Sequence, residues 1–136
     1  MKPVDVNRYA EPLKALMQEF SDECQVEMDV DVWLEQLPIT VPGYRLYGLF
    51  DEHDLVGFID ALPLVVPYAP WSVGYVQHVF VQRAYRGLGY YLMHHVLQYG
   101  KELGIPLVKI LCREQMRPLF ERMGFAVTRY EMEMEL

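Results

Sequence analysis

One segment restricts the possible folds more than any other, because it combines a strand, a glycine-containing turn and a helix. A β-rich run over residues 74–81 leads into the turn Arg86-Gly87-Leu88-Gly89. The helix predicted after this turn covers residues 89–103, with apolar side chains at helical spacing and Gly104 placed to end it. This strand–turn–helix unit predicts a sheet with helices packed against it.

The other segments add strands and helices to this unit. Asn7 or Asp5 can cap a first helix, in which Pro12 fits only near the start. Three prolines within residues 63–72 favour a rigid loop there rather than a strand. The further predicted elements are a short helix over 30–37, a hairpin of strands over 44–50 and 55–62, a strand over 107–112, a helix over 115–123 and a strictly alternating final strand over 130–136. The fold class is therefore α/β, or mixed α+β, with a single sheet flanked by helices.

Composition narrows the functional classes. The 136 residues suit one domain, 1–136, and no repeat or linker divides them. The net charge of −7 argues against nucleic acid as a partner, although basic residues outnumber acidic ones beyond residue 82. No signal peptide or apolar run long enough to cross a membrane is found, so no membrane partner is expected. Cys24 and Cys112 lack disulfide or metal-ligand spacing, which indicates the reducing cytoplasm and no metal site.

The turn after residue 81 has the features of a phosphate cradle. Its glycines allow a ligand to approach the backbone, and the first amides of the helix have no partner within the helix. The helix dipole favours an anion at this end, and Arg83 and Arg86 add positive charge. A tight strand-to-helix connection without a ligand would also explain the glycines. No Lys-Ser/Thr pair follows the turn, which argues against a P-loop, and the G-x-G-x-x-G spacing of dinucleotide-binding folds is absent.

Two motifs resemble those of the GNAT acyltransferases. The first is Arg86-Gly-Leu-Gly89 preceded by Val79-Phe80-Val81, which is similar to that family's acyl-CoA-binding motif. The second, Leu119-Phe120-Glu-Arg-Met-Gly124-Phe125, is similar to its helix-and-strand signature Leu-Tyr-x-x-x-Gly-Phe. The resemblance implies a mostly antiparallel central sheet in which two neighbouring strands splay apart.

The same resemblance implies acetyl-CoA as the acyl donor. The backbone of Val79, Phe80 and Val81 would pair with the pantetheine arm. The pyrophosphate and its surroundings would be held by Arg86, Gly87, Leu88, Gly89, Tyr90, Tyr91 and Arg113. Three residues depart from the family pattern. Tyr91 replaces a small residue, Arg113 a frequent Asn, and Phe120 the Tyr that often protonates the leaving thiolate.

Three residues on the strand before the turn are candidates for catalysis: Tyr75, Gln77 and His78, where relatives often carry Glu. His78 is the preferred general base, because imidazole titrates near neutral pH. Gln77 could orient a water molecule but cannot act as a base. Strand alternation places Tyr75 and Gln77 on one face and His78 on the other unless a bulge intervenes. A packed structural histidine is the alternative for His78.

The expected reaction is transfer of an acetyl group to a primary amine of a small molecule or peptide. By the same resemblance, the acceptor is expected between the first two helices and the loop after the second hairpin strand. Residues 21–31 carry five carboxylates there, and Tyr68 and Trp71 could stack on a cation. A solvated connection between the two helices would also explain the carboxylates. An inactive acyl-CoA-binding module is the alternative. A third possibility is an interaction protein whose final strand pairs two copies as a homodimer, which is compatible with either function.

Overall fold

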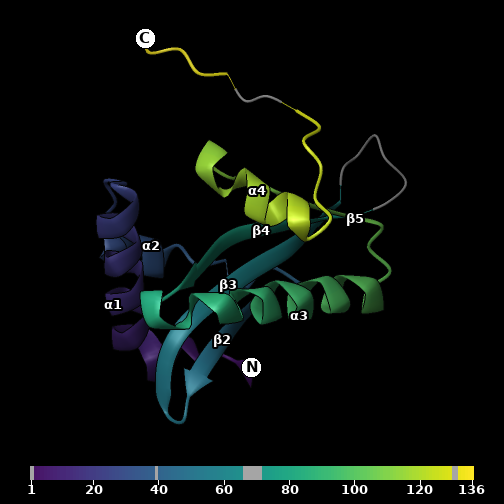
Figure 1. Ribbon diagram of the computed structural model, residues 1–136. Coiled ribbons are helices and arrows are strands. Elements are labelled where there is room, and N and C mark those ends of the chain that lie inside the picture. The colour runs from purple at the N-terminus through teal and green to yellow at the C-terminus, as the bar shows by residue number, and fades with distance from the viewer. Residues whose placement is uncertain (1, 39, 66–71, 130–131) are drawn as a thin grey trace.

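The computed structural model describes residues 2–38, 40–65, 72–129 and 132–136, and it contains one sheet with helices on both faces (Figure 1). Its elements, in chain order, are β1 (Lys2–Pro3), α1 (Val6–Cys24), α2 (Val30–Glu35), β2 (Arg45–Asp51), β3 (Asp54–Val65), β4 (Ser72–Val81), the 3-10 turn η1 (Arg83–Leu88), α3 (Gly89–Glu102), β5 (Leu107–Ile110), the 3-10 turn η2 (Glu114–Met116) and α4 (Arg117–Arg122). No helix in the described part of the chain is long and apolar enough to cross a membrane.

The five strands lie in the order β1-β2-β3-β4-β5, and only the last pair is parallel. This confirms the predicted mostly antiparallel sheet. The parallel pairing joins Val73–Val76 to Leu107–Ile110 and then stops, whereas β4 continues to Val81. Among the described residues, the last part of β4 has no partner strand on this side. The sheet therefore has the splayed strand pair expected from the sequence.

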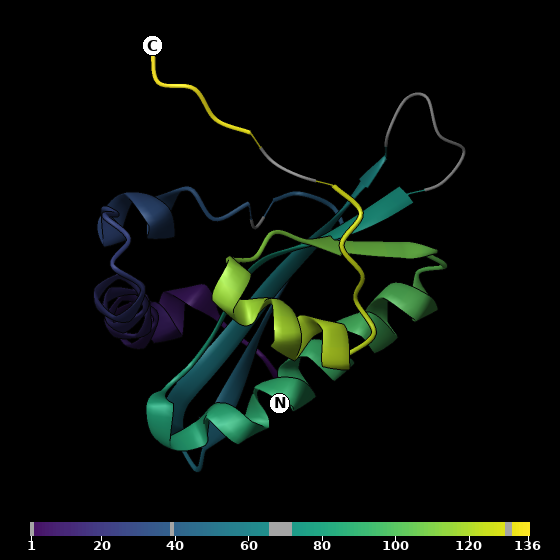
Figure 2. The same ribbon diagram turned by 45° about the horizontal axis from the view of Figure 1, so that its top comes forward.

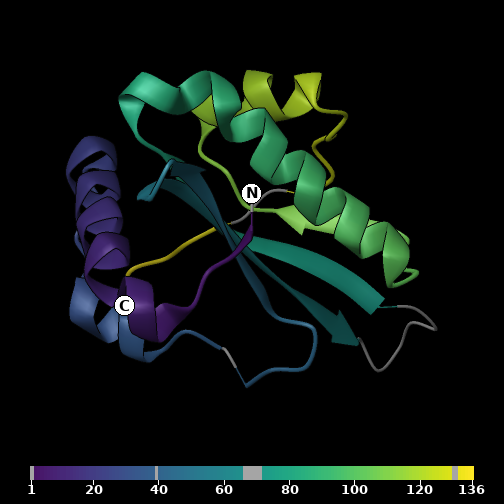
Figure 3. The same ribbon diagram turned by 90° about the horizontal axis from the view of Figure 1, so that it is seen from below.

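Each face of the sheet is covered by its own pair of helices (Figures 2 and 3). On one face, Leu13, Leu16 and Met17 of α1 pack with Phe58 of β3, and side chains of α2 complete this core. On the other face, side chains of α3 and α4 pack on the sheet. Its buried members are Tyr47, Ile59, Ala61, Val76, Val81, Leu92, Met93, Val96 and Phe120. The alternation of β3 and β4 side chains supplies both cores from the same two strands.

Helix α1 begins at a cap that the sequence offers. The Asp5 carboxylate accepts a hydrogen bond from the backbone N–H of Asn7 at 3.0 Å, so Asp5 is the N-cap. Tyr9 then leaves helical geometry, with φ −109° and ψ 20°. Pro12 thus lies in the first turn of the segment that follows this kink, where a missing N–H costs least.

Two predicted segments differ from the structure in their extent. Strand β3 continues through Pro63 to Val65 and pairs with β4 there, so the predicted loop is shorter than residues 63–72. Its aromatic candidates, Tyr68 and Trp71, lie outside the described residues. The helix predicted over 115–123 is divided into η2 and α4, because Pro118 occupies the first turn of α4 and favours a helix start there.

The predicted final strand over residues 130–136 is wrong for the part that the structure describes. Residues 132–136 have no strand assignment, and the side chains of Met132 and Met134 are almost fully exposed. Figures 1 and 2 show this tail running away from the sheet. An alternating segment becomes a strand only when a neighbouring strand supplies its hydrogen bonds, and this tail has none within the described residues. Residues 130–131 lie outside the description.

We expect the first core to depend strongly on Phe58, whose side chain is fully buried against α1 and α2. Replacing it with Ala should lower the free energy of unfolding by about 3–5 kcal/mol, because a large cavity opens in the core. Urea denaturation followed by circular dichroism measures this change. Val127→Ala is the control: its side chain is half exposed, so its effect should stay within about 0.5 kcal/mol. Equal effects of the two variants would contradict this core assignment.

Candidate functional site

The predicted turn leads directly into α3. After β4 ends, the backbone N–H of Gln82 donates to the carbonyl of Val56 at 2.9 Å, which fixes the direction of the chain as it enters η1. Helix α3 begins at Gly89, as the sequence predicts, and its N-cap is Leu88. No side chain of the described residues caps it. The positive end of a helix of 14 residues therefore lies at the end of β4.

The two glycines of the turn leave its surface bare. Neither has a positive φ, so backbone strain does not explain them. A Cβ added at Gly87 would meet no atom of the described residues within 4 Å, and one at Gly89 would meet only Val81 Cγ2, at 3.5 Å. Packing within the chain therefore does not require glycine at position 87. An external anion that approaches the amides, such as a phosphate, would benefit from it.

The two arginines expected at the cofactor contact the end of α1 instead. Arg86 forms an ion pair with Glu23, and Arg113 donates a hydrogen bond from Nη1 to the carbonyl of Cys24 at 2.5 Å. Gln82 also reaches α1, where its Nε2 donates to Glu19 at 3.1 Å. The last turns of α1 therefore lie against the segments that follow β4 and β5. A phosphate that binds Arg86 must compete with the Glu23 carboxylate.

The other predicted cofactor residues divide into two groups. The side chains of Phe80 and Val81 are buried in the two cores, and Val79 packs against the second, so this part of β4 can offer a ligand only its backbone edge. Leu88, Tyr90 and Tyr91 are exposed on the turn. The ring of Tyr90 stacks on His94, with an interplanar angle of 16° and a centroid distance of 6.0 Å. The Tyr91 ring is also exposed, so neither tyrosine fills the core.

A β-bulge changes which residues of β4 share a face. Asp60 pairs with His78, but the next residue of β3, Ala61, pairs with Val76. Gln77 is therefore the extra residue, and its side chain is exposed. Tyr75 pairs with Leu62, two residues from Asp60, so Tyr75 and His78 lie on the same face, toward α1 and α2. The unbroken alternation that would separate them is wrong, because the bulge adds one residue between them.

The His78 side chain is part of a hydrogen-bonded chain. Its Nδ1 lies 2.9 Å from Oδ1 of Asp60, and its own backbone N–H donates to the same oxygen at 2.8 Å. The other carboxylate oxygen, Oδ2, accepts a hydrogen bond from the Tyr44 hydroxyl at 2.9 Å. Trp33 of α2 meets the imidazole edge-on, with centroids 5.7 Å apart. His78 is thus half-buried and held by residues from three other segments.

The sequence analysis missed Asp60 and Tyr44. Asp60 has no exposed surface, which is rare for a carboxylate that lacks partners. Burial, and then the charge of Asp60 and the hydrogen bond to it, raises the pKa of the Tyr44 phenol well above its ordinary value, so the phenol remains a donor. One signal in the sequence could have found the pair: Asp60 is the only charged residue within the predicted apolar strand over 55–62.

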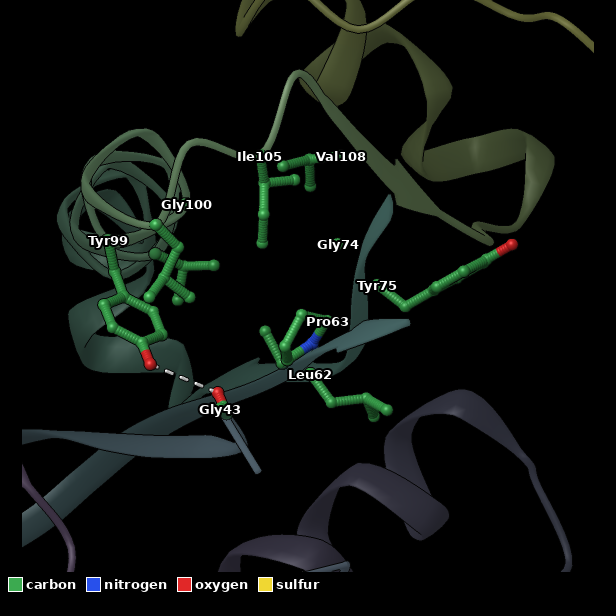
Figure 4. Close-up of a pocket in the computed structure, with 12 residues that line it drawn as sticks. Gly43, Leu62, Pro63, Gly74, Tyr75, Tyr99, Gly100, Ile105 and Val108 are labelled. Atoms are coloured by element: carbon green, nitrogen blue, oxygen red, sulfur yellow. Dashed lines mark hydrogen bonds between the residues drawn. The ribbon is translucent and has the colours of Figure 1, made fainter. Parts of the chain in front are cut away.

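Two hollows on the surface of the described residues lie away from the turn. Figure 4 shows an apolar one against the start of β4 and the second half of α3, lined by residues such as Leu62, Pro63 and Tyr99, with the Tyr75 ring directed away from it. A second, open hollow lies at the α1–α2 connection, where Glu27, Asp29 and Asp31 contribute to its lining. The second hollow lies where the sequence predicts the acceptor.

Most of the acidic residues at this connection have partners in the chain. Asp29 caps α2 by accepting from the backbone N–H of Asp31 and Val32, and Asp31 pairs with Lys14 at 2.7 Å. Glu23 binds Arg86, and Asp22 accepts from Gln18 at 2.9 Å. These four carboxylates have structural roles. The fifth carboxylate of this connection, Glu27, lines the open hollow.

Comparison with known families identifies the chain. The model of the acetyltransferase (GNAT) family matches residues 10–125, which is most of the sequence. The chain belongs to the GNAT acetyltransferase family. Members of this family are acyltransferases. No curated protein sequence matches the chain closely enough to count as a relative.

Solved structures share the GNAT fold over nearly the whole chain at low identity. The glucosamine-6-phosphate N-acetyltransferase of Arabidopsis thaliana has a TM-score of 0.79 and 13% identity, covering 98% of this chain and 95% of its own. The ribosomal-protein-alanine N-acetyltransferase of Brucella melitensis has a TM-score of 0.76 and 19% identity, covering 95% and 93%. An aminoglycoside acetyltransferase from an uncultured soil sample, in complex with sisomicin, has a TM-score of 0.70 and 14% identity, covering 98% and 95%.

One departure from the GNAT motif now has a structural explanation. Phe120 is buried in the second core, where its ring meets Phe125 edge-on at a centroid distance of 5.9 Å. It occupies the position at which the motif usually has tyrosine, and it serves here as a packing residue. The phenyl ring has no proton to give to a leaving thiolate. Among the described residues, no group of three or more His, Cys, Asp or Glu side chains could hold a metal ion.

The first prediction from this site concerns Gly87. Gly87→Glu should raise the dissociation constant for acetyl-CoA at least about tenfold, because a carboxylate would oppose the pyrophosphate on a bare surface. Isothermal titration calorimetry measures the change. Gly87→Gln has nearly the same shape without the charge and should weaken binding less. Both variants should keep the wild-type melting temperature, because a side chain at this position meets open space. Equal affinity for Gly87→Glu and wild type would exclude the turn as the anion site.

The second prediction concerns the ion pair between Arg86 and Glu23. Glu23→Gln should tighten acetyl-CoA binding by up to about fivefold, since an ion pair this exposed contributes at most about 1 kcal/mol. Glu11→Gln makes the same charge change at a carboxylate that pairs with Lys14 within α1, and it should leave the affinity unchanged. Calorimetry on both variants separates release of Arg86 from a general change in net charge. Weaker binding by Glu23→Gln would show that Glu23 supports the site rather than competing for it.

Proposed function

We propose that this GNAT protein is an N-acetyltransferase that moves the acetyl group of acetyl-CoA to a primary amine of a small molecule or peptide. One observation carries the proposal: three features belong to one continuous stretch of chain. They are the bare turn at Gly87, the edge of β4 that has no partner strand among the described residues, and the His78 side chain. An anion site, an open strand edge and a base are the parts that acyl transfer from a nucleotide thioester needs.

In this proposal, the backbone amides from Gly87 to Tyr91 bind the pyrophosphate. Arg86 and Arg113 contribute positive charge once they are released from Glu23 and Cys24. The free edge of Val79, Phe80 and Val81 pairs with the pantetheine arm as an added strand would. Acetyl-CoA supplies the activated acyl group as a thioester. The protein supplies binding, orientation and proton transfer.

His78 is the proposed general base. It lies at the bulge, next to the point where β4 stops pairing with β5, and it is partly open to solvent. An ammonium group must lose a proton before its nitrogen can attack, and the attacking amine loses another proton as the tetrahedral intermediate forms. A neutral imidazole can accept that proton. Gln77 is exposed at the extra position and can orient a water molecule. Tyr75 shares the face of His78 and is a candidate for contact with the acceptor.

The amine class of acceptor has two supports. The named acceptors of the neighbouring enzymes, glucosamine-6-phosphate, a protein alanine and aminoglycosides, all carry amines. The open hollow at the α1–α2 connection is lined by acidic side chains, of which Glu27 is a candidate for attracting an ammonium group. Glu27→Gln should then raise KM for the amine without changing the affinity for acetyl-CoA.

A second candidate function is an acyl-CoA-binding or interaction module without turnover. Phe120 favours it, because the position that often supplies the proton for the leaving thiolate is part of the core. The exposed Met132, Met134 and Leu136 at the end of the chain favour an interaction role, including a homodimer. Binding of acetyl-CoA without release of free thiol in the presence of any amine would select this second function.

The deciding experiment is calorimetric titration with acetyl-CoA, followed by a thiol-release assay over a panel of amines. We expect His78→Gln to lower kcat by about 10²- to 10⁴-fold, as loss of a general base does, while acetyl-CoA still binds. His53→Gln, in the exposed β2–β3 turn, is the control and should keep wild-type activity. Full activity of His78→Gln would remove His78 from the mechanism.

A further inference from the structure

The buried carboxylate of Asp60 is the least expected group in this fold. It lies in the middle of the sheet with no exposed surface, between Phe58 and Leu62, which face the same apolar core. An ionised carboxylate in such a place is costly unless it is fully hydrogen-bonded. Asp60 accepts from the Tyr44 hydroxyl on one oxygen, and its other oxygen meets both the backbone N–H and Nδ1 of His78. An apolar residue would fill this position at lower cost, so packing does not explain the choice of Asp.

The donors around Asp60 determine the state of the imidazole. A carboxylate in its ionised form only accepts hydrogen bonds, and beside that form the Nδ1 that lies 2.9 Å from Oδ1 carries the proton. In a neutral imidazole, the lone pair then belongs to Nε2. The Tyr44 phenol, which remains protonated, occupies the second oxygen and completes the shell of the carboxylate.

Asp60 also connects the ring to the backbone of the bulge. The same Oδ1 that meets Nδ1 accepts the backbone N–H of His78, so one oxygen sets both the local course of β4 and the ring orientation. Trp33 packs edge-on against the other side of this arrangement and restricts rotation of the ring. The imidazole is therefore contacted from β3 by Asp60 and from α2 by Trp33.

We infer that Asp60 is a positioning residue that holds His78 as the Nδ1–H tautomer, with the Nε2 lone pair available to take a proton from the acceptor. The role in turnover rests on the proposed function, whereas the tautomer itself does not. In the proton transfer, the N–H bond of the attacking amine breaks, and its proton joins Nε2 while Nδ1–H remains hydrogen-bonded to Asp60. The imidazolium that forms faces a carboxylate, which stabilises its charge.

The first test needs no substrate. Long-range ¹H–¹⁵N correlation spectra of the ligand-free protein, taken where the imidazoles are neutral, distinguish a protonated Nδ1 from a protonated Nε2. The His78 signals are assigned by their absence in His78→Gln. We expect a protonated Nδ1 and a bare Nε2. A protonated Nε2, or a ring that averages both forms, would overturn the inference whatever the enzyme does.

The second test changes the carboxylate. Asp60→Asn keeps the shape but offers an amide that can donate to Nδ1, so the proton should move to Nε2 in part or completely. We expect kcat to fall at least about 10²-fold. The loss can be larger when the carboxylate that fixes the tautomer of a catalytic histidine is replaced by an amide. The dissociation constant for acetyl-CoA should remain within about twofold, because the turn at Gly87 is untouched. An unchanged tautomer together with unchanged kcat would overturn the positioning role.

Tyr44→Phe is the matched variant, because it removes a donor from Asp60 without touching His78. It should keep the Nδ1–H tautomer and most of kcat, while lowering the melting temperature as much as Asp60→Asn or more. If Tyr44→Phe lowers kcat as far as Asp60→Asn with the tautomer intact, loss of stability explains both losses and the inference fails. If His78→Gln retains full activity, the proposed base is wrong, and the spectra still decide the tautomer.

Discussion

Strand β4 has one residue more than the stretch of β3 with which it pairs, and the extra residue, Gln77, lies directly after the last pair with β5, Val76 and Ile110. A bulge increases the local twist of a strand and bends it. The two parallel strands thus part at the position where one of them is bent. The open edge of Val79–Val81 and the orientation of His78 both follow from this one irregularity, and so does the gap in which the proposed cofactor arm would lie.

The end of α1 connects the two regions of the site. Glu23 and Cys24 bind the arginines that follow β4 and β5, while the residues just after them form the acidic connection to α2. A phosphate that takes Arg86 from Glu23 would therefore act on the segment that borders the proposed acceptor hollow. The ion pair and the hydrogen bond involved are exposed, whereas Phe20 and Met28, on either side of them in the sequence, pack against the first core.

The two faces of β4 pack against different helices and carry different kinds of side chains. Side chains of Val76, Val79 and Val81 face α3 and belong to an apolar core that also receives Phe120. On the other side, Tyr75, His78 and Phe80 face α1 and α2, and there a polar group, Asp60, interrupts the apolar surface. The proposed base thus lies on the face of the sheet that packs against α1 and α2. A tyrosine at position 120, as GNAT relatives often have, would belong to the core on the face of the sheet opposite to His78.

Local features of the sequence account for much of the fold. Short stretches of sequence predict the order of elements over residues 6–123, the cap at Asp5, the start of α3 at Gly89 and the GNAT resemblance of the turn, because helix starts and tight turns depend on neighbouring residues. Strand β1 before the first helix was not predicted. The splayed strand pair was reached through the resemblance. The bare surface of the turn agrees with what its glycines suggest, since nothing in the chain packs against Gly87.

Other features were decided by the tertiary structure alone. The bulge at Gln77 depends on the register between β3 and β4, which no local pattern specifies, and it reversed the expected relation between Tyr75 and His78. The partners of Asp60 lie 16 and 18 residues away in the sequence, so its role could not be derived from the strand that contains it. The tail is another feature that its local sequence pattern does not specify. Its alternation predicts a strand, but a strand exists only where a neighbour completes its hydrogen bonds. The sequence by itself therefore determined the elements and the family, whereas pairing across the sheet decided which side chains meet.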